Sequence, residues 1–166
     1  MIGRLVVVAL LICACQVNAA PQCNLFKILD NEQQLVVEYS YARGKEIDMG
    51  YTLAAIALTE SSAGKHRVNL KDPSSGSYHI LVHTAAARLN VTDELEKLNL
   101  LHKIATDDVL GATLAILELS YWDTKHNGDW RKTVMSYNAG HKYWKGVNYL
   151  KKITYYVKEL KQCKIL

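Results

Sequence analysis

Helix-breaking and disorder-promoting residues are scarce in this sequence. It has only 2 prolines and 9 glycines among 166 residues, and it contains no tract of serine, glutamine or glycine. A chain with this composition is not a disordered or linker-built protein. No repeat of about 35 residues is visible, which argues against a helical repeat array. These absences leave one ordinary globular domain, long enough to bury a substantial core.

A strong excess of charge of either sign is also lacking. The sequence has 20 Lys and Arg against 16 Asp and Glu, a formal net charge of +4. A dedicated nucleic-acid-binding protein usually crowds its basic residues into one arm or patch. No such cluster is visible, so we expect no nucleic-acid partner. The mild positive charge suits attraction to an anionic surface or polymer.

The one long apolar run, Leu5–Cys15, is too short to cross a bilayer, which takes about 20 residues. It follows Arg4 and is succeeded by small residues. This order is typical of a secretory signal peptide. We predict a signal peptide over residues 1–19 and a mature domain over residues 20–166, exported to the periplasm or cell envelope. An uncleaved anchor and a lipidated cysteine are the alternatives.

Cysteine is scarce once the predicted signal peptide is removed, because only Cys23 and Cys163 remain. An exported domain meets an oxidising compartment, where two leftover cysteines usually pair. The ends of a domain often lie near each other. We therefore predict a disulfide between them, with two free thiols as the alternative. The cysteine and histidine spacings match no zinc pattern, and we expect no metal or other cofactor.

Apolar residues recur at helical spacing over most of the predicted mature domain. The fold class we expect is mainly α, and residues 25–42 are too mixed to assign. Residues 62–82 are rich in Ser, Gly, Asp and Asn and predict a short irregular or β-hairpin lobe. Helices are expected over residues 46–61, 84–89, 93–105, 107–122, 129–138 and 146–162.

Glu60 comes near the end of the expected helix 46–61, after several turns of apolar residues. No basic residue occurs within the seven positions before it. A carboxylate at the rim of an apolar groove has its charged form disfavoured and can hold a proton near neutral pH. A general acid that breaks a glycosidic bond needs this property. Taken alone, an ordinary solvated glutamate is the simpler interpretation.

Three short motifs follow one another along the chain. They are Glu60-Ser61, then Gly76-Ser77-Tyr78-His79-Ile80, then Ser136-Tyr137-Asn138-Ala139-Gly140 at an expected helix end. This ordered set resembles the lytic transglycosylase family (soluble lytic transglycosylase-like, of the lysozyme-like superfamily). That family has Glu-Ser at a helix end, a Gly-Leu-Met-Gln-Ile type loop and an Ala-Tyr-Asn-Ala-Gly element. The resemblance covers about residues 45–145.

Two departures from the family pattern accompany the resemblance. Ser77-Tyr78-His79 stands where the family has Leu-Met-Gln, and Asp108 stands where the family often has Asn before the next helix. Histidine both donates and accepts hydrogen bonds, and tyrosine can stack on sugars, so both can still line a sugar groove. The sugar contacts of this loop are therefore expected to differ from those of the family.

The resemblance implies a lysozyme-like single domain and peptidoglycan glycan strands as the substrate. In the family, one glutamate protonates the bridging oxygen of the MurNAc-β-1,4-GlcNAc bond. It then takes the proton of the C6 hydroxyl, which attacks C1 and leaves a 1,6-anhydro end. Glu60 matches that residue. Substrate contacts are implied for Ser61, Asn69, Tyr78, His79, Tyr137 and Asn138. The alternatives are a hydrogen bond to the helix end or orientation of Glu60 for Ser61, a core aromatic for Tyr137 and a backbone cap for Asn138.

Two other functions stay open at this point. One is a lysozyme-type hydrolase (muramidase) on the same fold, which would need a second carboxylate, with Asp72 as the first candidate. The other is a non-catalytic peptidoglycan-binding protein. Small family members accompany secretion, conjugation, pilus and phage assemblies, so we expect a partner of that kind. Location in a phage virion is therefore an alternative to the cell envelope, and a monomer is expected.

The predicted disulfide is testable by thiol counting and unfolding. A bridge between Cys23 and Cys163 closes a loop of about 140 residues, so its reduction should lower the free energy of unfolding by about 4–5 kcal/mol. Residues 20–166 should show no free thiol before reduction and two after it. A Cys23→Ser/Cys163→Ser protein is the control, and its stability should not respond to reductant. Two reactive thiols in the untreated protein would contradict the prediction.

Overall fold

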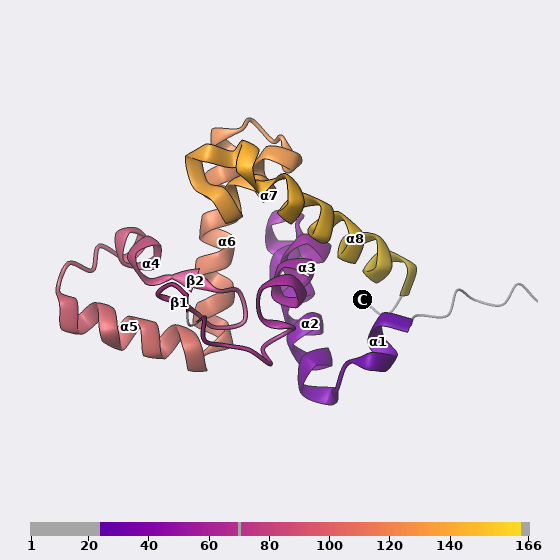
Figure 1. Ribbon diagram of the computed structural model, residues 1–166, viewed down its shortest axis with the longest axis horizontal. Coiled ribbons are helices and arrows are strands. Elements are labelled where there is room, and N and C mark those ends of the chain that lie inside the picture. The colour runs from indigo at the N-terminus through magenta and orange to yellow at the C-terminus, as the bar shows by residue number, and fades with distance from the viewer. Residues whose placement is uncertain (1–23, 70, 164–166) are drawn as a thin grey trace, which may run out of the picture.

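Helix α3, Gly50–Ser61, forms the centre of the computed structural model, which describes residues 24–69 and 71–163. Every side chain from Leu53 to Ala57 is fully buried. A helix that is apolar on all sides has to be covered on all sides. α2 (Asn31–Gly44) and α8 (Val147–Cys163) pack against it (Figure 1). The sequence pattern predicts one apolar face, whereas the structure buries nearly the whole helix.

The mixed segment at residues 25–42 is helical, in two pieces. α1 (Asn24–Ile28) ends before Asp30, and the side chain of Asp30 caps α2 by accepting a hydrogen bond from Gln33 N at 2.9 Å. Gln33 Oε1 accepts in return from Asp30 N at 3.0 Å, which completes a capping box. The left-handed Asp48, with φ of 57°, then follows a short 3-10 turn and delays the start of α3 to Gly50.

The irregular lobe expected around residues 62–82 is confirmed. β1 (Ser74–Ser75) pairs antiparallel with β2 (Ile80–Leu81), and α4 (Val82–Leu89) and α5 (Glu94–Thr106) pack around this hairpin. Figure 1 shows this lobe at the left of the molecule, apart from α3 and α8. Strands of two residues cannot hold a lobe together, so its shape has to come from other contacts.

α6 (Asp108–Lys125) joins the two parts of the fold, because it packs against α2 on one side and against α4 and α5 on the other (Figure 1). Asp107 caps it by accepting from Val109 N at 2.8 Å and Leu110 N at 3.1 Å. α7 (Trp130–Ala139) follows and ends at Gly140, as the sequence predicts. The 3-10 segment η2 (Gly140–Gly146) leads into α8. The mainly α fold class is thus confirmed.

Cys23 and residues 1–19 lie outside the described residues. The disulfide between Cys23 and Cys163 and the signal peptide therefore stay predictions. α1, which begins one residue after Cys23, packs against α8, which ends at Cys163. None of the helices described between residues 24 and 163 is long and apolar enough to cross a membrane.

Gly76 is needed for the turn that joins the two short strands. Its φ of 78° lies in the left-handed region, and a Cβ at this position would collide with the carbonyl oxygen of Ile104 on α5. Its amide also donates to Arg67 O at 2.7 Å. Only a residue without a side chain combines this φ with such a close approach.

Replacement of Gly76 separates these two requirements. Gly76→Ala should lower the free energy of unfolding by about 2–4 kcal/mol, because left-handed strain and a steric collision add together. Gly128→Ala is the matched control, since Gly128 has φ of 77° but no neighbour within 4 Å of the added Cβ. That control should lose about 1 kcal/mol from conformational strain alone. Equal losses in urea unfolding would contradict the close contact.

Candidate active site

Glu60 occupies the last turn of α3, where the helix leaves the core. Ser62 takes a left-handed conformation, and Ala63 N donates to Ala57 O at 2.8 Å, which closes the helix end. Gln33 Nε2 on α2 donates to Ser62 O at 2.8 Å and holds this end from the other side. The Glu60 side chain is 17% exposed, so the carboxylate lies at a rim between core and solvent.

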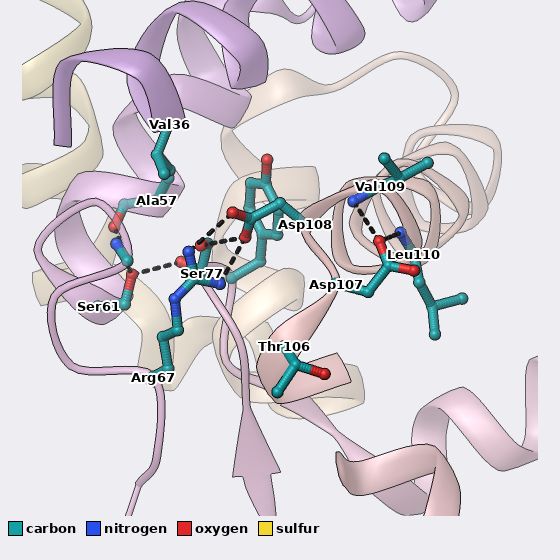
Figure 2. A network of polar contacts seen from close by, with 12 residues as sticks. Val36, Ala57, Ser61, Arg67, Ser77, Thr106, Asp107, Asp108, Val109 and Leu110 are labelled. Carbon is teal, nitrogen blue, oxygen red and sulfur yellow. Dashed lines mark hydrogen bonds and ion pairs between the residues drawn. The ribbon is translucent and has the colours of Figure 1, made fainter. Parts of the chain in front are cut away.

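Ser61 ties the helix end to the hairpin loop. Its hydroxyl donates to Ser77 O at 2.7 Å and accepts from Gly64 N at 2.7 Å (Figure 2). The residue is completely buried. Burial leaves Ser61 no surface for a substrate contact, and the alternative prediction, a hydrogen bond at the helix end, is what the structure shows. Ser61 fixes the backbone on both sides of Glu60 because a hydroxyl next to a helix end can serve several backbone groups at once.

Asp108 is the centre of the polar network in Figure 2. It accepts a two-pronged pair from the Arg67 guanidinium, with Nη1–Oδ1 and Nη2–Oδ2 both at 2.7 Å. Ser77 Oγ donates to the same carboxylate at 2.5 Å. Asp108 is also the first residue of α6, where the helix dipole favours a negative charge. Asp108 therefore supplies an ion pair that holds the loop.

The charge of Asp108 is stabilised by its partners. Partial burial acts to raise the pKa of this carboxyl, but the hydrogen bonds from Arg67 and Ser77 outweigh that effect, and the pKa of Asp108 lies below its ordinary value. The carboxylate is therefore charged at neutral pH, and its pairing with Arg67 contributes to the stability of the loop.

Tyr78 is buried, so the prediction that it binds substrate is wrong. Its side chain has no exposed surface, and its hydroxyl lies 2.9 Å from Ser40 Oγ on α2. The Ser40 hydroxyl proton goes to Val36 O at 2.6 Å, so the Tyr78 hydroxyl is the donor of that pair. The ring also packs against Gly111 on α6, where a Cβ would lie 3.3 Å from it. Tyr78 thus fixes the loop to α2 and α6.

His79 follows Tyr78 and lies beside Glu60, and its predicted substrate contact stays a prediction. Its Nδ1 lies 3.6 Å from Glu60 Oε2, and its Nε2 lies 2.8 Å from His66 O. The backbone is left-handed here, with φ of 44°. The contact with Glu60 raises the pKa of His79 above its usual value, burial opposes the rise, and the His66 carbonyl adds to it.

Two tyrosines complete the surroundings of Glu60. The Tyr137 hydroxyl, on α7, donates to Tyr78 O at 3.0 Å, and its ring stacks on that of Tyr149 from α8 with 6.5 Å between centroids. Burial raises the pKa of both hydroxyls, and the negative charge of nearby Glu60 raises each further. The Tyr149 hydroxyl is buried without a hydrogen bond of regular geometry to any described residue. Its contact with the Glu60 carboxylate also raises the pKa of Tyr149, so this hydroxyl is a donor directed at Glu60.

Asn69 and Asn138 are not placed against Glu60 by any contact. Asn69 Oδ1 accepts from Lys71 N at 3.0 Å, which makes a local turn in the loop. Asn138 is exposed on the last turn of α7. Substrate contacts for these two residues stay predictions. Asp72, the candidate second carboxylate, is exposed on the same loop.

A small pocket of about 50 Å³ opens beside His79 and Tyr137. Arg88 from α4 and Glu118 from α6 line its other side, with Arg88 Nη2 at 2.8 Å from Glu118 Oε2. Trp122 Nε1 donates to Glu118 Oε1 at 2.5 Å. Both oxygens of this second carboxylate are thus engaged, so Glu118 cannot act readily as a base or a nucleophile.

Tyr149, Arg88 and Glu118 were missed by the sequence reasoning. Tyr149 carried a usable signal, because it lies four residues before Ile153 and therefore shares a helical face with that buried residue. Arg88 and Glu118 carried none, since they are 30 residues apart and meet only when α4 packs beside α6.

One carboxylate, one imidazole and the Tyr149 hydroxyl therefore meet at the rim of the core, with the Tyr137 hydroxyl nearby on Tyr78 O. Such a set can give and take a proton and can donate hydrogen bonds to a bound oxygen. Among residues 24–69 and 71–163, no group of three His, Cys, Asp or Glu is arranged to hold a metal ion.

The Asp108 network predicts a pH-dependent stability. A carboxyl whose pKa is depressed in the folded state stabilises the fold above its unfolded pKa of about 3.9, and that contribution is lost as the pH falls through the folded value. Asp108→Asn should lower the free energy of unfolding at pH 7 by about 1–3 kcal/mol. The difference from wild type should shrink below about pH 4.

The control for this experiment is Glu94→Gln, which removes an exposed pair with Lys97 on α5. Such a pair contributes little, so that variant should stay within about 0.5 kcal/mol of wild type at all pH values. A difference between wild type and Asp108→Asn that is the same at pH 7 and at pH 3 would contradict the charged network.

Comparison with known proteins finds similarity to a phage protein. The chain is similar to the "Uncharacterized 20.7 kDa protein in vs-regB intergenic region" of Enterobacteria phage T4. The two sequences are 35% identical over 127 residues, which cover 71% of this chain and 66% of the phage protein. The chain thus spans slightly less than two thirds of that protein's length. No family model and no solved structure matches the chain.

Proposed function

We propose that this protein is a peptidoglycan lytic transglycosylase in which Glu60 is the single acid and base. The observation that supports this most directly is the position of Glu60. Its carboxylate lies at the rim of the core, 17% exposed, between an imidazole and two tyrosines. Within the described part of the chain, no lysine or arginine pairs with it. A proton donor and acceptor for a sugar oxygen needs such an open but dry position.

The reaction proposed consumes no water. Glu60 gives its proton to the bridging oxygen of the MurNAc-β-1,4-GlcNAc bond, and the bond between that oxygen and C1 breaks. Glu60 then accepts the proton of the C6 hydroxyl, which bonds to C1 and leaves a 1,6-anhydro end. The proton is thereby returned to Glu60, and the enzyme ends as it began.

The tyrosine hydroxyls have a role in this reaction that follows from their chemistry. With pKa values raised by burial and by the charge of Glu60, Tyr137 and Tyr149 stay neutral. The Tyr137 hydroxyl donates to Tyr78 O and so holds the loop that carries His79. The Tyr149 hydroxyl is directed at the Glu60 carboxylate. We assign it to holding that carboxylate in place for the bound sugar, because a donor already in place costs no reorganisation.

The state of the other carboxylates favours a transglycosylase over a hydrolase. A two-carboxylate glycosidase needs a second carboxylate about 5–9 Å from the first that is free to activate water or to attack carbon. Glu118 is held at both oxygens by Arg88 and Trp122. Asp72 is exposed on the loop and is the remaining candidate for a hydrolase.

Similarity to a protein of phage T4 favours a phage setting among the assemblies considered, in which local opening of the wall accompanies infection or release. In a phage setting the partner is a virion assembly, and in a cell envelope it is an envelope-spanning assembly. The substrate in both is the glycan strand of the wall.

Digestion of purified peptidoglycan tests the proposal. Wild-type protein should release fragments lighter by one water molecule than hydrolysis products, as measured by mass spectrometry. Glu60→Gln should lose at least about 10²-fold in rate, because an amide cannot pass the proton. Glu38→Gln, an exposed carboxylate on α2, is the matched control and should cleave like wild type.

Other outcomes would redirect the assignment. Fragments with reducing ends that disappear in Asp72→Asn would make the protein a two-carboxylate hydrolase. No cleavage, together with retained binding to the wall by wild type and Glu60→Gln alike, would make it a peptidoglycan-binding protein.

A further inference from the structure

The two ring nitrogens of His79 have different partners, and this places one of its hydrogens. Nε2 is 2.8 Å from the backbone oxygen of His66, which can only accept, so Nε2 carries a hydrogen. Nδ1 faces Glu60 Oε2 at 3.6 Å. A proton on either Nδ1 or Oε2 would therefore lie between the two side chains and could pass from one to the other.

The backbone holds the ring in this position at a conformational cost. His79 has φ of 44°, a region that residues with a side chain rarely occupy. The loop is held just before it, because Ser77 O accepts from Ser61 and Tyr78 O accepts from Tyr137. A residue kept in a strained conformation by its surroundings is often one whose side chain has to be aimed.

Few other charges compete for this proton. Glu60 contributes most to the raised pKa of His79, and Asp72 on the loop raises it further. Arg88 and Glu118, across the adjacent pocket, neutralise each other at 2.8 Å. Both nearby tyrosines are neutral: the Tyr149 hydroxyl is directed at the Glu60 carboxylate and the Tyr137 hydroxyl donates to Tyr78 O. The His66 side chain is exposed. Both members of the pair are mostly buried, at 13% and 17% exposure, so solvent screens them little.

We propose that Glu60 and His79 share one proton and that His79 is the positioning residue that keeps this proton on the pair near neutral pH. The 3.6 Å separation is longer than a direct hydrogen bond, and a small side-chain rotation or one water closes it. The catalytic consequence rests on the proposed function, whereas the shared proton itself does not.

The consequence concerns the alkaline limit of activity. While the pair holds its proton, Glu60 can deliver it to a sugar oxygen and His79 returns to its neutral form. Once the pair has lost that proton, a carboxylate and a neutral imidazole remain, and no acid is left. Without His79, the imidazole that retains the proton is absent, and activity should be lost at lower pH.

Imidazole titration by NMR tests the shared proton without any substrate. In the full domain, the His79 resonance, identified by its absence in His79→Gln, should titrate above the usual value of about 6.5. In Glu60→Gln it should titrate at least about one pH unit lower than in wild type. Glu38→Gln, the exposed carboxylate control, should leave it unmoved. An unchanged His79 titration in Glu60→Gln would overturn the proposal.

The pH profile of peptidoglycan cleavage tests the positioning role. The alkaline limb of His79→Gln should move to lower pH by at least about one unit, with most of the rate kept on the acidic side. His79→Gly removes the imidazole while suiting the left-handed backbone, so it should show the same shift if folding is not the cause. His102→Gln, an exposed histidine on α5, is the control.

The two tests separate failure of this inference from failure of the proposed function. If the cleavage rate falls at the same alkaline pH in wild type and in both His79 variants, the positioning role is overturned even if cleavage is confirmed. Absence of cleavage by wild type would overturn the function, and the NMR titration would then decide the shared proton by itself.

Discussion

The carboxylate of Asp108 is the constraint on which the rest of the site depends. It binds the Arg67 guanidinium by two hydrogen bonds and the Ser77 hydroxyl by a third, so it joins the hairpin loop to the first turn of α6. The strands of that hairpin are only two residues long and cannot define its position alone. Because Ser77 O in turn accepts from Ser61, the same network reaches the end of α3.

A buried helix that ends in a carboxylate explains the position of Glu60. α3 is covered on nearly all sides, and the chain turns sharply at Ser62, where Gln33 holds the backbone from α2. Glu60 therefore lies at the edge of the core on a rigid helix, α3. A group held on such an element keeps its geometry better than one on a loop. The partners come from elsewhere in the chain, His79 from the clamped loop and Tyr137 and Tyr149 from α7 and α8.

The short motifs that identify the site in the sequence divide into two kinds of residue. Glu60, His79 and Tyr137 face the candidate site, while Ser61 and Tyr78, their neighbours in the chain, are buried and hold the loop in place. The two kinds alternate because a turn that presents one side chain to a groove turns the next into the core. The motifs therefore encode the support of the site as much as its chemistry.

Local patterns in the sequence were sufficient to predict most of the secondary structure. Asp93, Asp107 and Asp129 cap helices by accepting from backbone amides nearby, and Gly140 ends α7. Capping and helical periodicity depend on neighbours a few residues apart, so they are visible without tertiary structure. The split of residues 25–42 into α1 and α2 was missed, although Asp30 and Gln33 form a capping box there.

Only the tertiary structure decided what surrounds Glu60. The sequence by itself determined a mainly α domain, an irregular lobe at residues 62–82 and a carboxylate at the end of an apolar helix. It did not determine that Tyr78 points into the core, that Tyr149 lies beside Glu60, or that Glu118 is held by Arg88. The physical reason is that these contacts join helices far apart in the chain, and the direction of each side chain follows from how α4, α6, α7 and α8 pack together.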